Sequence, residues 1–175
     1  MANRRPVQQH HEREVVADFL SWLNFRYGTY YSVVAEPNPP DAIIQSVRVT
    51  RWIEVVDAFW TEEYAKDLYS AATLGEGRKP VGPGPHVGMD VCFAESFVKA
   101  VSGKLQKNSY LPFLKKYGAG YLVVSIQHRW FDGHTVRQMK NFWSHGRPWP
   151  DNGFFKEIYI AYPSLNRRAF RRWTV

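Results

Sequence analysis

A run of apolar residues in the second half of the chain constrains the fold more than any other feature: Tyr121-Leu122-Val123-Val124-Ser125-Ile126. It follows the turn-forming segment Gly118-Ala119-Gly120. A short, continuous apolar run bounded by such a turn is typical of a strand that is buried on both faces, as in parallel sheets covered by helices. We therefore expect residues 121–126 to form the central strand of an α/β fold.

The segments around this run alternate between helical and strand patterns. Apolar residues recur at helical spacing over Glu12 to Leu23, with Val15, Val16 and Phe19 on one face. We predict strands near 30–34, 42–44, 52–56 and 154–162, and further helices over 61–72, from about 94 to 106, and after Asp132. A chain of 175 residues fits one domain, 1–175, with a basic C-terminal tail at about 164–175.

Composition excludes several classes of protein. The single cysteine, Cys92, cannot form an intramolecular disulfide or a thiolate zinc site. The histidines lack the spacing of a zinc motif, and His10 and His11 are expected at a frayed helix start. No apolar segment reaches the roughly 18 residues of a membrane span, and the polar N-terminus has no signal-peptide core. We expect a soluble, cytoplasmic protein without a membrane partner.

The formal charge of +7 is unevenly distributed along the chain. Residues 1–100 carry 10 Lys and Arg against 13 Asp and Glu, whereas residues 101–175 carry 13 against 3. This segregation is typical of a protein in which carboxylates gather at one site while a basic surface receives a polyanion. Charge therefore favours a nucleic-acid partner, although a basic surface also serves solubility.

Two acidic residues stand in predicted strands, where Asp and Glu are depleted. Asp41 opens a strand after Pro39-Pro40, and Glu54 interrupts the apolar segment from Trp52 to Val56. A hairpin would bring both carboxylates to one end of the sheet, where Mg²⁺ or Mn²⁺ could lie between them. The alternative is structural: Glu54 as an outward-facing strand residue and Asp41 as a turn residue.

Pro40-Asp41, a strand, and then Glu54-Val55-Val56 on a following strand resemble the PD-(D/E)XK nuclease superfamily, the restriction-endonuclease-like fold. The resemblance covers about two-thirds of the chain. It implies a mixed central sheet flanked by helices, with an αβββαβ core to which a C-terminal helix and strand are added. It also implies a Mg²⁺- or Mn²⁺-dependent endonuclease in which Asp41, Glu54 and the backbone carbonyl of Val55 hold the metal, supported by a glutamate of the first helix.

The sequence departs from the family at one position, because Val56 stands where the motif has a lysine. In some members that lysine has moved to the following helix. At about 100° per residue from Phe97, Lys104 falls at about 340°, beside the apolar stripe. Lys104 is therefore the candidate to act on the attacking water or the phosphate, and a lysine that only covers the edge of the apolar face is the alternative.

The helical geometry of the first segment bears on its acidic residues in the same way. Glu12 falls within the apolar face of the predicted helix and Glu14 falls outside it. Glu12 is therefore the favoured first-helix glutamate, and Glu14 stays open because the helix start is not fixed by the sequence.

Basic side chains outside this cluster are the candidates for binding nucleic acid, with DNA favoured over RNA. They are Arg78, Lys79, Lys107, Arg129, Arg167, Arg168, Arg171 and Arg172, the last four in a tail that also contains Trp173. A homodimer would set two sites against two strands. The missing motif lysine favours a rival, a catalytically inactive nuclease-like module that binds nucleic acid, and a protein-interaction domain is a third reading.

Overall fold

The computed structural model describes residues 5–73, 75–82, 88–128, 130–145, 153–164 and 167–174. Its elements, in chain order, are α1 (Arg5–Tyr27), β1 (Ser32–Ala35), β2 (Ala42–Gln45), β3 (Thr50–Phe59), α2 (Glu62–Ala72), α3 (Met89–Leu105), the 3₁₀ turn η1 (Asn108–Tyr110), α4 (Leu111–Tyr117), β4 (Gly120–Gln127), α5 (Gly133–His145), β5 (Phe155–Ser164) and β6 (Arg167–Arg172). Within these residues, none of the helices combines the length and apolar character that crossing a membrane requires.

A single mixed sheet organises the chain, with its strands in the order β1-β2-β3-β4-β5-β6. β4 pairs in parallel with β3 on one side and with β5 on the other, while the outer pairs are antiparallel. β4 is buried from Gly120 to Ile126, as a continuous apolar run predicts. The α/β class and the central strand expected from the sequence are therefore confirmed.

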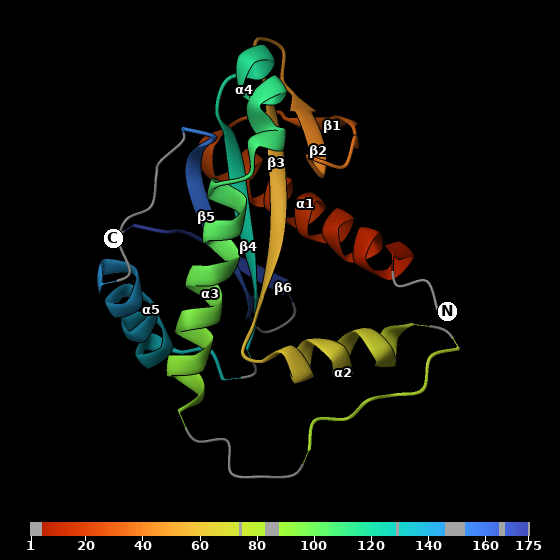
Figure 1. Ribbon diagram of the computed structural model, residues 1–175. Coiled ribbons are helices and arrows are strands. Elements are labelled where there is room, and N and C mark those ends of the chain that lie inside the picture. The colour runs from red at the N-terminus through yellow and green to blue at the C-terminus, as the bar shows by residue number, and fades with distance from the viewer. Residues whose placement is uncertain are drawn as a thin grey trace.

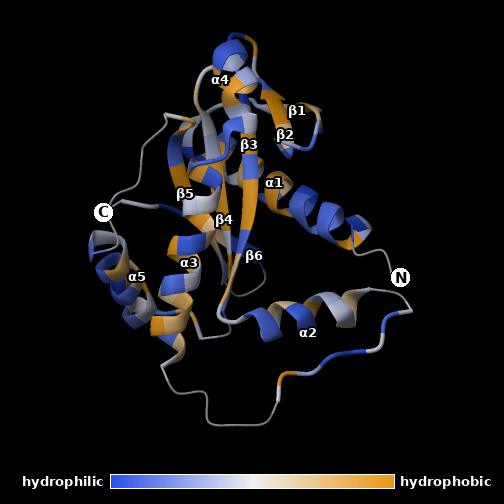
Figure 2. Ribbon diagram, in the orientation of Figure 1, coloured by the Kyte–Doolittle hydropathy of each residue, from blue (hydrophilic) through white to orange (hydrophobic). Residues whose placement is uncertain are grey.

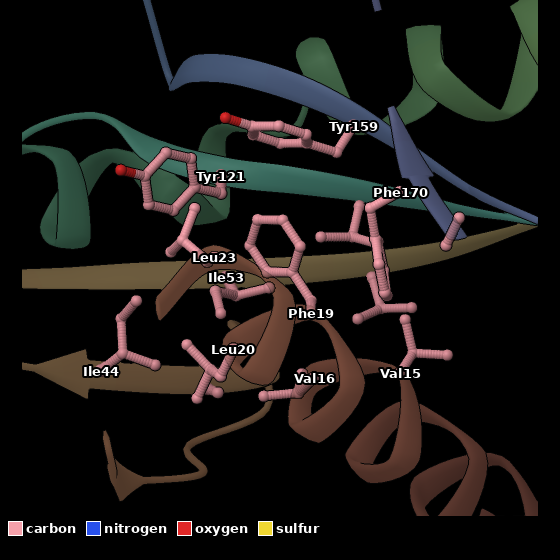
Figure 3. Packing of buried hydrophobic residues seen from close by; sticks show 14 residues of the cluster. Val15, Val16, Phe19, Leu20, Leu23, Ile44, Ile53, Tyr121, Tyr159 and Phe170 are labelled. Carbon is pink, nitrogen blue, oxygen red and sulfur yellow. The ribbon is translucent and has the colours of Figure 1, made fainter. Parts of the chain in front are cut away.

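Helix α1 covers one face of this sheet (Figure 1). Its buried residues are the predicted stripe of Val15, Val16, Phe19, Leu20 and Leu23. Figure 3 shows Phe19 at the centre of this layer, facing Tyr159 and Phe170 from the sheet. The side of α1 opposite this stripe is exposed.

Helices α3 and α5 cover the other face (Figure 1). The hydropathy colours in Figure 2 show apolar strands between them and α1, with hydrophilic residues on the outer sides of the helices. Trp173, which follows β6, packs against Phe97 of α3 and Trp143 of α5, with ring centroids 5.0 and 5.8 Å apart. This packing fixes α3, the helix that carries Lys104, against the sheet.

The segment predicted to be a basic tail is different in the structure, because its residues 167–172 form strand β6. β6 pairs antiparallel with β5, and Phe170 is buried against α1. The strand was not predicted because its sequence contains four arginines around Phe170 and so lacks a clear alternation of apolar and polar residues. Trp173 is buried as well, so it cannot stack on a base as the sequence suggested.

A further buried cluster, which consists mainly of aromatic residues, was also not predicted. Trp52 of β3 stacks on Tyr110 of η1, with ring centroids 5.3 Å apart, and both side chains are fully buried. Phe154 completes the cluster. η1 and α4 therefore close the sheet at the end where β3 and β4 begin, a segment for which the sequence offered no clear helical pattern.

Gly120 offers a test of this packing. A Cβ on Gly120 would lie 2.4 Å from the indole ring of Trp52 and 2.7 Å from the Trp52 carbonyl oxygen. Because the backbone cannot give way easily, we expect Gly120→Ala to lower the free energy of unfolding by about 2 kcal/mol or more in urea denaturation. Gly133→Ala is the control, since a Cβ there meets nothing within 4 Å. Equal stability of the two variants would contradict this account.

Candidate functional site

The candidate site lies where one edge of β3 is left open. β2 pairs with β3 only from Thr50 to Ile53, and among the described residues no strand continues along that edge. The backbone N–H of Val55 therefore has no strand partner there. It donates instead to Asp41 Oδ2 at 2.7 Å. Asp41, just before β2, thus caps the open edge, and the Val55 carbonyl lies on the same edge because both groups of a strand residue point the same way.

Glu54 is the buried carboxylate beside this edge. Its residue is only 2% exposed, on the sheet face that α3 covers. Oε1 accepts hydrogen bonds from Lys104 Nζ at 2.5 Å and from the Tyr110 hydroxyl at 2.8 Å. Oε2 is buried and has no hydrogen-bond partner among the described residues. A buried carboxylate oxygen without a partner is costly, so this atom is the candidate ligand of the site.

The two carboxylates predicted from the sequence do lie close enough to influence each other. Burial, together with the negative charge of Glu54, raises the pKa of Asp41 to about 7. The hydrogen bond from Val55 N and the charge of Lys104 act in the opposite direction but are weaker. Asp41 and Glu54 therefore form one electrostatic unit, which a cation placed between them would stabilise.

The first helix contributes Glu12 to this unit and directs Glu14 elsewhere. Burial raises the pKa of Glu12, and the charges of Asp57 and Glu54 add to the effect. Glu12 also shares a pocket of about 40 Å³ with Asp41. Glu14 is exposed, and lies 3.6 Å from His10 and 3.9 Å from Arg168. The structure thus places Glu12 in the same pocket as Asp41, and Glu14 outside that pocket.

Lys104 lies where its helical position suggested. It extends from the last turn of α3 to Glu54, with its side chain 23% exposed. Val56 faces the same side of β3 and packs into the apolar cluster beneath α3 and α5. A lysine at 56 would have to leave that cluster, whereas Lys104 reaches the same carboxylate from above. Lys104 thus supplies an ammonium group to Glu54 from a position 50 residues later in the sequence.

Sequence reasoning missed two neighbours of this cluster. Tyr110 donates to Glu54 from a turn that carries no recognisable motif. His11, expected to be frayed, lies 2.9 Å from Asp57, which also accepts from the Tyr69 hydroxyl. Burial alone would raise the pKa of Asp57, but these hydrogen bonds and the His11 charge lower it. The hydrogen bond to Asp57 in turn raises the pKa of His11.

The predicted nucleic-acid-binding residues divide into two groups. The paired ones are Arg78 with Asp67, Lys79 with Glu76, Arg168 with Asp18 and Arg172 with Glu157. Carboxylate partners reduce the charge that these four offer to a polyanion. Lys107, Arg167 and Arg171 are exposed, and Arg129 lies outside the described residues. Of the exposed group, Lys107 stands beside the candidate site, over the Tyr110 ring.

A hard cation at this site would need waters or substrate phosphates, in addition to the described side chains, to complete its coordination shell. Within the described residues, no three His, Cys, Asp or Glu side chains gather closely enough to form a metal cage by themselves. Mg²⁺ does not need such a cage, because it commonly uses one or two carboxylates and completes its shell with waters and substrate phosphates. Asp41, the free Oε2 of Glu54 and the Val55 carbonyl fit that donor set.

No family model, curated protein or solved structure matches this chain in the three comparisons.

The pKa of Asp41 generates a test by pH. In the unfolded chain the pKa of this carboxyl is about 4. Between about pH 4 and 7 the folded state therefore holds more protons than the unfolded state. The free energy of unfolding therefore falls as pH rises through that window. Asp41→Asn removes this titration and keeps an oxygen that can accept from Val55. We expect urea denaturation in EDTA to show a smaller fall between pH 5 and pH 8 in Asp41→Asn than in the wild type.

Glu14→Gln is the matched control for this pH experiment, because Glu14 is exposed and lies away from Asp41. It should keep the wild-type dependence. An undiminished fall in Asp41→Asn would show that the pH dependence comes from other groups.

Proposed function

We propose that this protein is a divalent-metal-dependent nuclease that hydrolyses phosphodiester bonds of nucleic acid, with DNA as the favoured substrate. The observation that carries the proposal is the asymmetric environment of Glu54. One of its oxygens is held by Lys104 and Tyr110, and the other is buried with no hydrogen-bond partner among the described residues. The charge of Glu54 also acts on the nearby Asp41. A carboxylate fixed in this way is ready to bind a cation.

Mg²⁺ or Mn²⁺ is the cofactor that these donors fit. Glu54 Oε2 and the carboxylate of Asp41 supply negative charge, and the Val55 carbonyl supplies a neutral oxygen at the open edge of β3. When bound, the metal would stabilise charge on the phosphate and lower the pKa of a coordinated water. Glu12 lies near enough to add to the negative potential that attracts the cation.

Lys104 supplies the positive charge on the substrate side of the cluster. Paired with Glu54, its ammonium group has protons to donate and no lone pair with which to accept one. Its role is therefore to donate a hydrogen bond to a nonbridging phosphate oxygen and to offset the charge that develops as water attacks phosphorus and the leaving oxygen departs. The proton of the water passes to solvent or to the leaving oxygen.

A second candidate function is a catalytically inactive nuclease-like module that binds nucleic acid. Two observations favour it: Val56 in place of the motif lysine, and the lack of a three-ligand metal cage among the described residues. This rival predicts binding that weakens with salt and needs no divalent ion. The two candidates therefore differ in one measurable property, metal-stimulated turnover.

Cleavage assays test the proposal. Glu54→Gln keeps the size of the side chain and removes its charge, so we expect cleavage of plasmid and single-stranded DNA in Mg²⁺ or Mn²⁺ to fall by about 100-fold or more. Asp41→Asn should lose a similar factor. Glu14→Gln, on the same helix as Glu12 but outside the cluster, should retain wild-type activity.

Activity that survives in both Glu54→Gln and Asp41→Asn would remove the assignment of the site. A wild-type protein that binds DNA without metal-stimulated cleavage would leave the inactive module as the function.

A further inference from the structure

A groove runs along α3 from the candidate site. It encloses about 510 Å³ and is lined by residues of three elements. From α3 come Lys99, Gly103 and Lys104, with Lys107 just beyond the end of that helix, and from α2 come Glu62 and Ala65. Asp57 and Phe59 of β3 form the floor. Lys104 lines this groove and also binds Glu54, so this lysine connects the groove with the carboxylate cluster.

Gly103 is unexpected in this position. It lies inside α3, where glycine costs about 1 kcal/mol of helix stability relative to alanine. A Cβ at Gly103 would meet nothing within 4 Å, so no neighbouring atom excludes a side chain there. Any longer side chain would project into the groove. The glycine therefore keeps the helix surface bare at a point where a ligand can approach the backbone closely.

Two lysines flank this bare surface. Lys99 lies one turn before Gly103 in α3, and Lys107 follows four residues after Gly103, just beyond the end of the helix. Both are exposed, and neither has a carboxylate partner within ion-pair distance among the described side chains. They differ in this respect from Arg78 and Arg168, which are neutralised by aspartates. The groove thus presents free positive charge on both sides of Gly103.

We propose that the backbone of the strand to be cut lies in this groove, passes over Gly103, and places phosphates on Lys99 and Lys107 on either side of the bond that faces Glu54 and Lys104. The volume falls among sites that enclose small molecules, about 300 to 1,000 Å³, so the groove holds a short stretch of one strand and not a duplex cross-section. The position of the cut rests on the proposed nuclease function, whereas binding in the groove does not.

The first experiment fills the groove without changing its charge. Gly103→Gln should lower the affinity for a fluorescently labelled 20-nucleotide single strand, or for the matching duplex, by about tenfold, because the side chain occupies the path of the backbone. Affinity is measured by fluorescence anisotropy in EDTA, so that no cleavage occurs. Gly103→Ala is the matched control: it adds one methyl group, should stabilise the helix, and should bind within about twofold of the wild type.

The second experiment removes the charge and keeps the shape. Lys99→Gln combined with Lys107→Gln should weaken binding by about tenfold and reduce the slope of log affinity against log salt by about 1.4 for a single strand. Lys115→Gln combined with Lys116→Gln removes the same charge from exposed positions on α4 and is the matched control. Its loss should be clearly smaller, because those lysines lie outside the groove.

The outcomes separate the groove from the proposed chemistry. A loss on either probe that is confined to the groove variants, with thermal unfolding showing them folded, supports the groove whether or not the wild type cleaves. If Gly103→Gln and the Lys99/Lys107 variant both bind the two probes with wild-type affinity, the proposal that the groove binds the strand is overturned. The proposed metal-dependent cleavage is then tested separately by Glu54→Gln. Failure of the wild type to bind either probe at low salt overturns the groove as well.

Discussion

The structure depends on the point at which β2 stops pairing with β3. Up to Ile53 the two strands share hydrogen bonds, and beyond it the backbone of β3 is open on one edge. Asp41 is held there because Val55 needs an acceptor, and Glu54 is buried there because Lys104 and Tyr110 hold it. One unpaired edge thus brings charge from helices on both faces of the sheet to a single location.

This arrangement also explains how buried charge is tolerated. Glu54 is compensated by a lysine that reaches it from α3, and Asp57 by His11 from α1. Asp41 accepts a hydrogen bond from the Val55 N–H, and burial together with the negative charge of Glu54 raises its pKa. Lys104 and Tyr110 thus hold one oxygen of Glu54, while the other has no hydrogen-bond partner among the described residues.

Much of this fold could be predicted because its signals are local. The stripe of α1, the helix predicted over 61–72 and the apolar run of β4 each follow from neighbouring residues. Lys104 could be chosen because its angle relative to the stripe of α3 follows from helical geometry. The metal and the activity suggested by the family resemblance stay predictions, since geometry alone does not test them.

The remainder could not be predicted because it depends on long-range contacts. Tyr110 bonds Glu54 across 56 positions, and His11 meets Asp57 across 46. Strand β6 is stabilised because Phe170 packs against α1, although the sequence of β6 is dominated by arginine. The periodicity of a local segment does not indicate which distant residues its side chains will contact.

The contact between Lys104 and Glu54 joins positions separated by 50 residues and by the whole of α2. In an unfolded or half-folded chain these two charges belong to unrelated stretches of polymer in water. The proposed site would then assemble only in the native fold, so that the proposed nuclease would not cut nucleic acid from a misfolded or partly degraded copy.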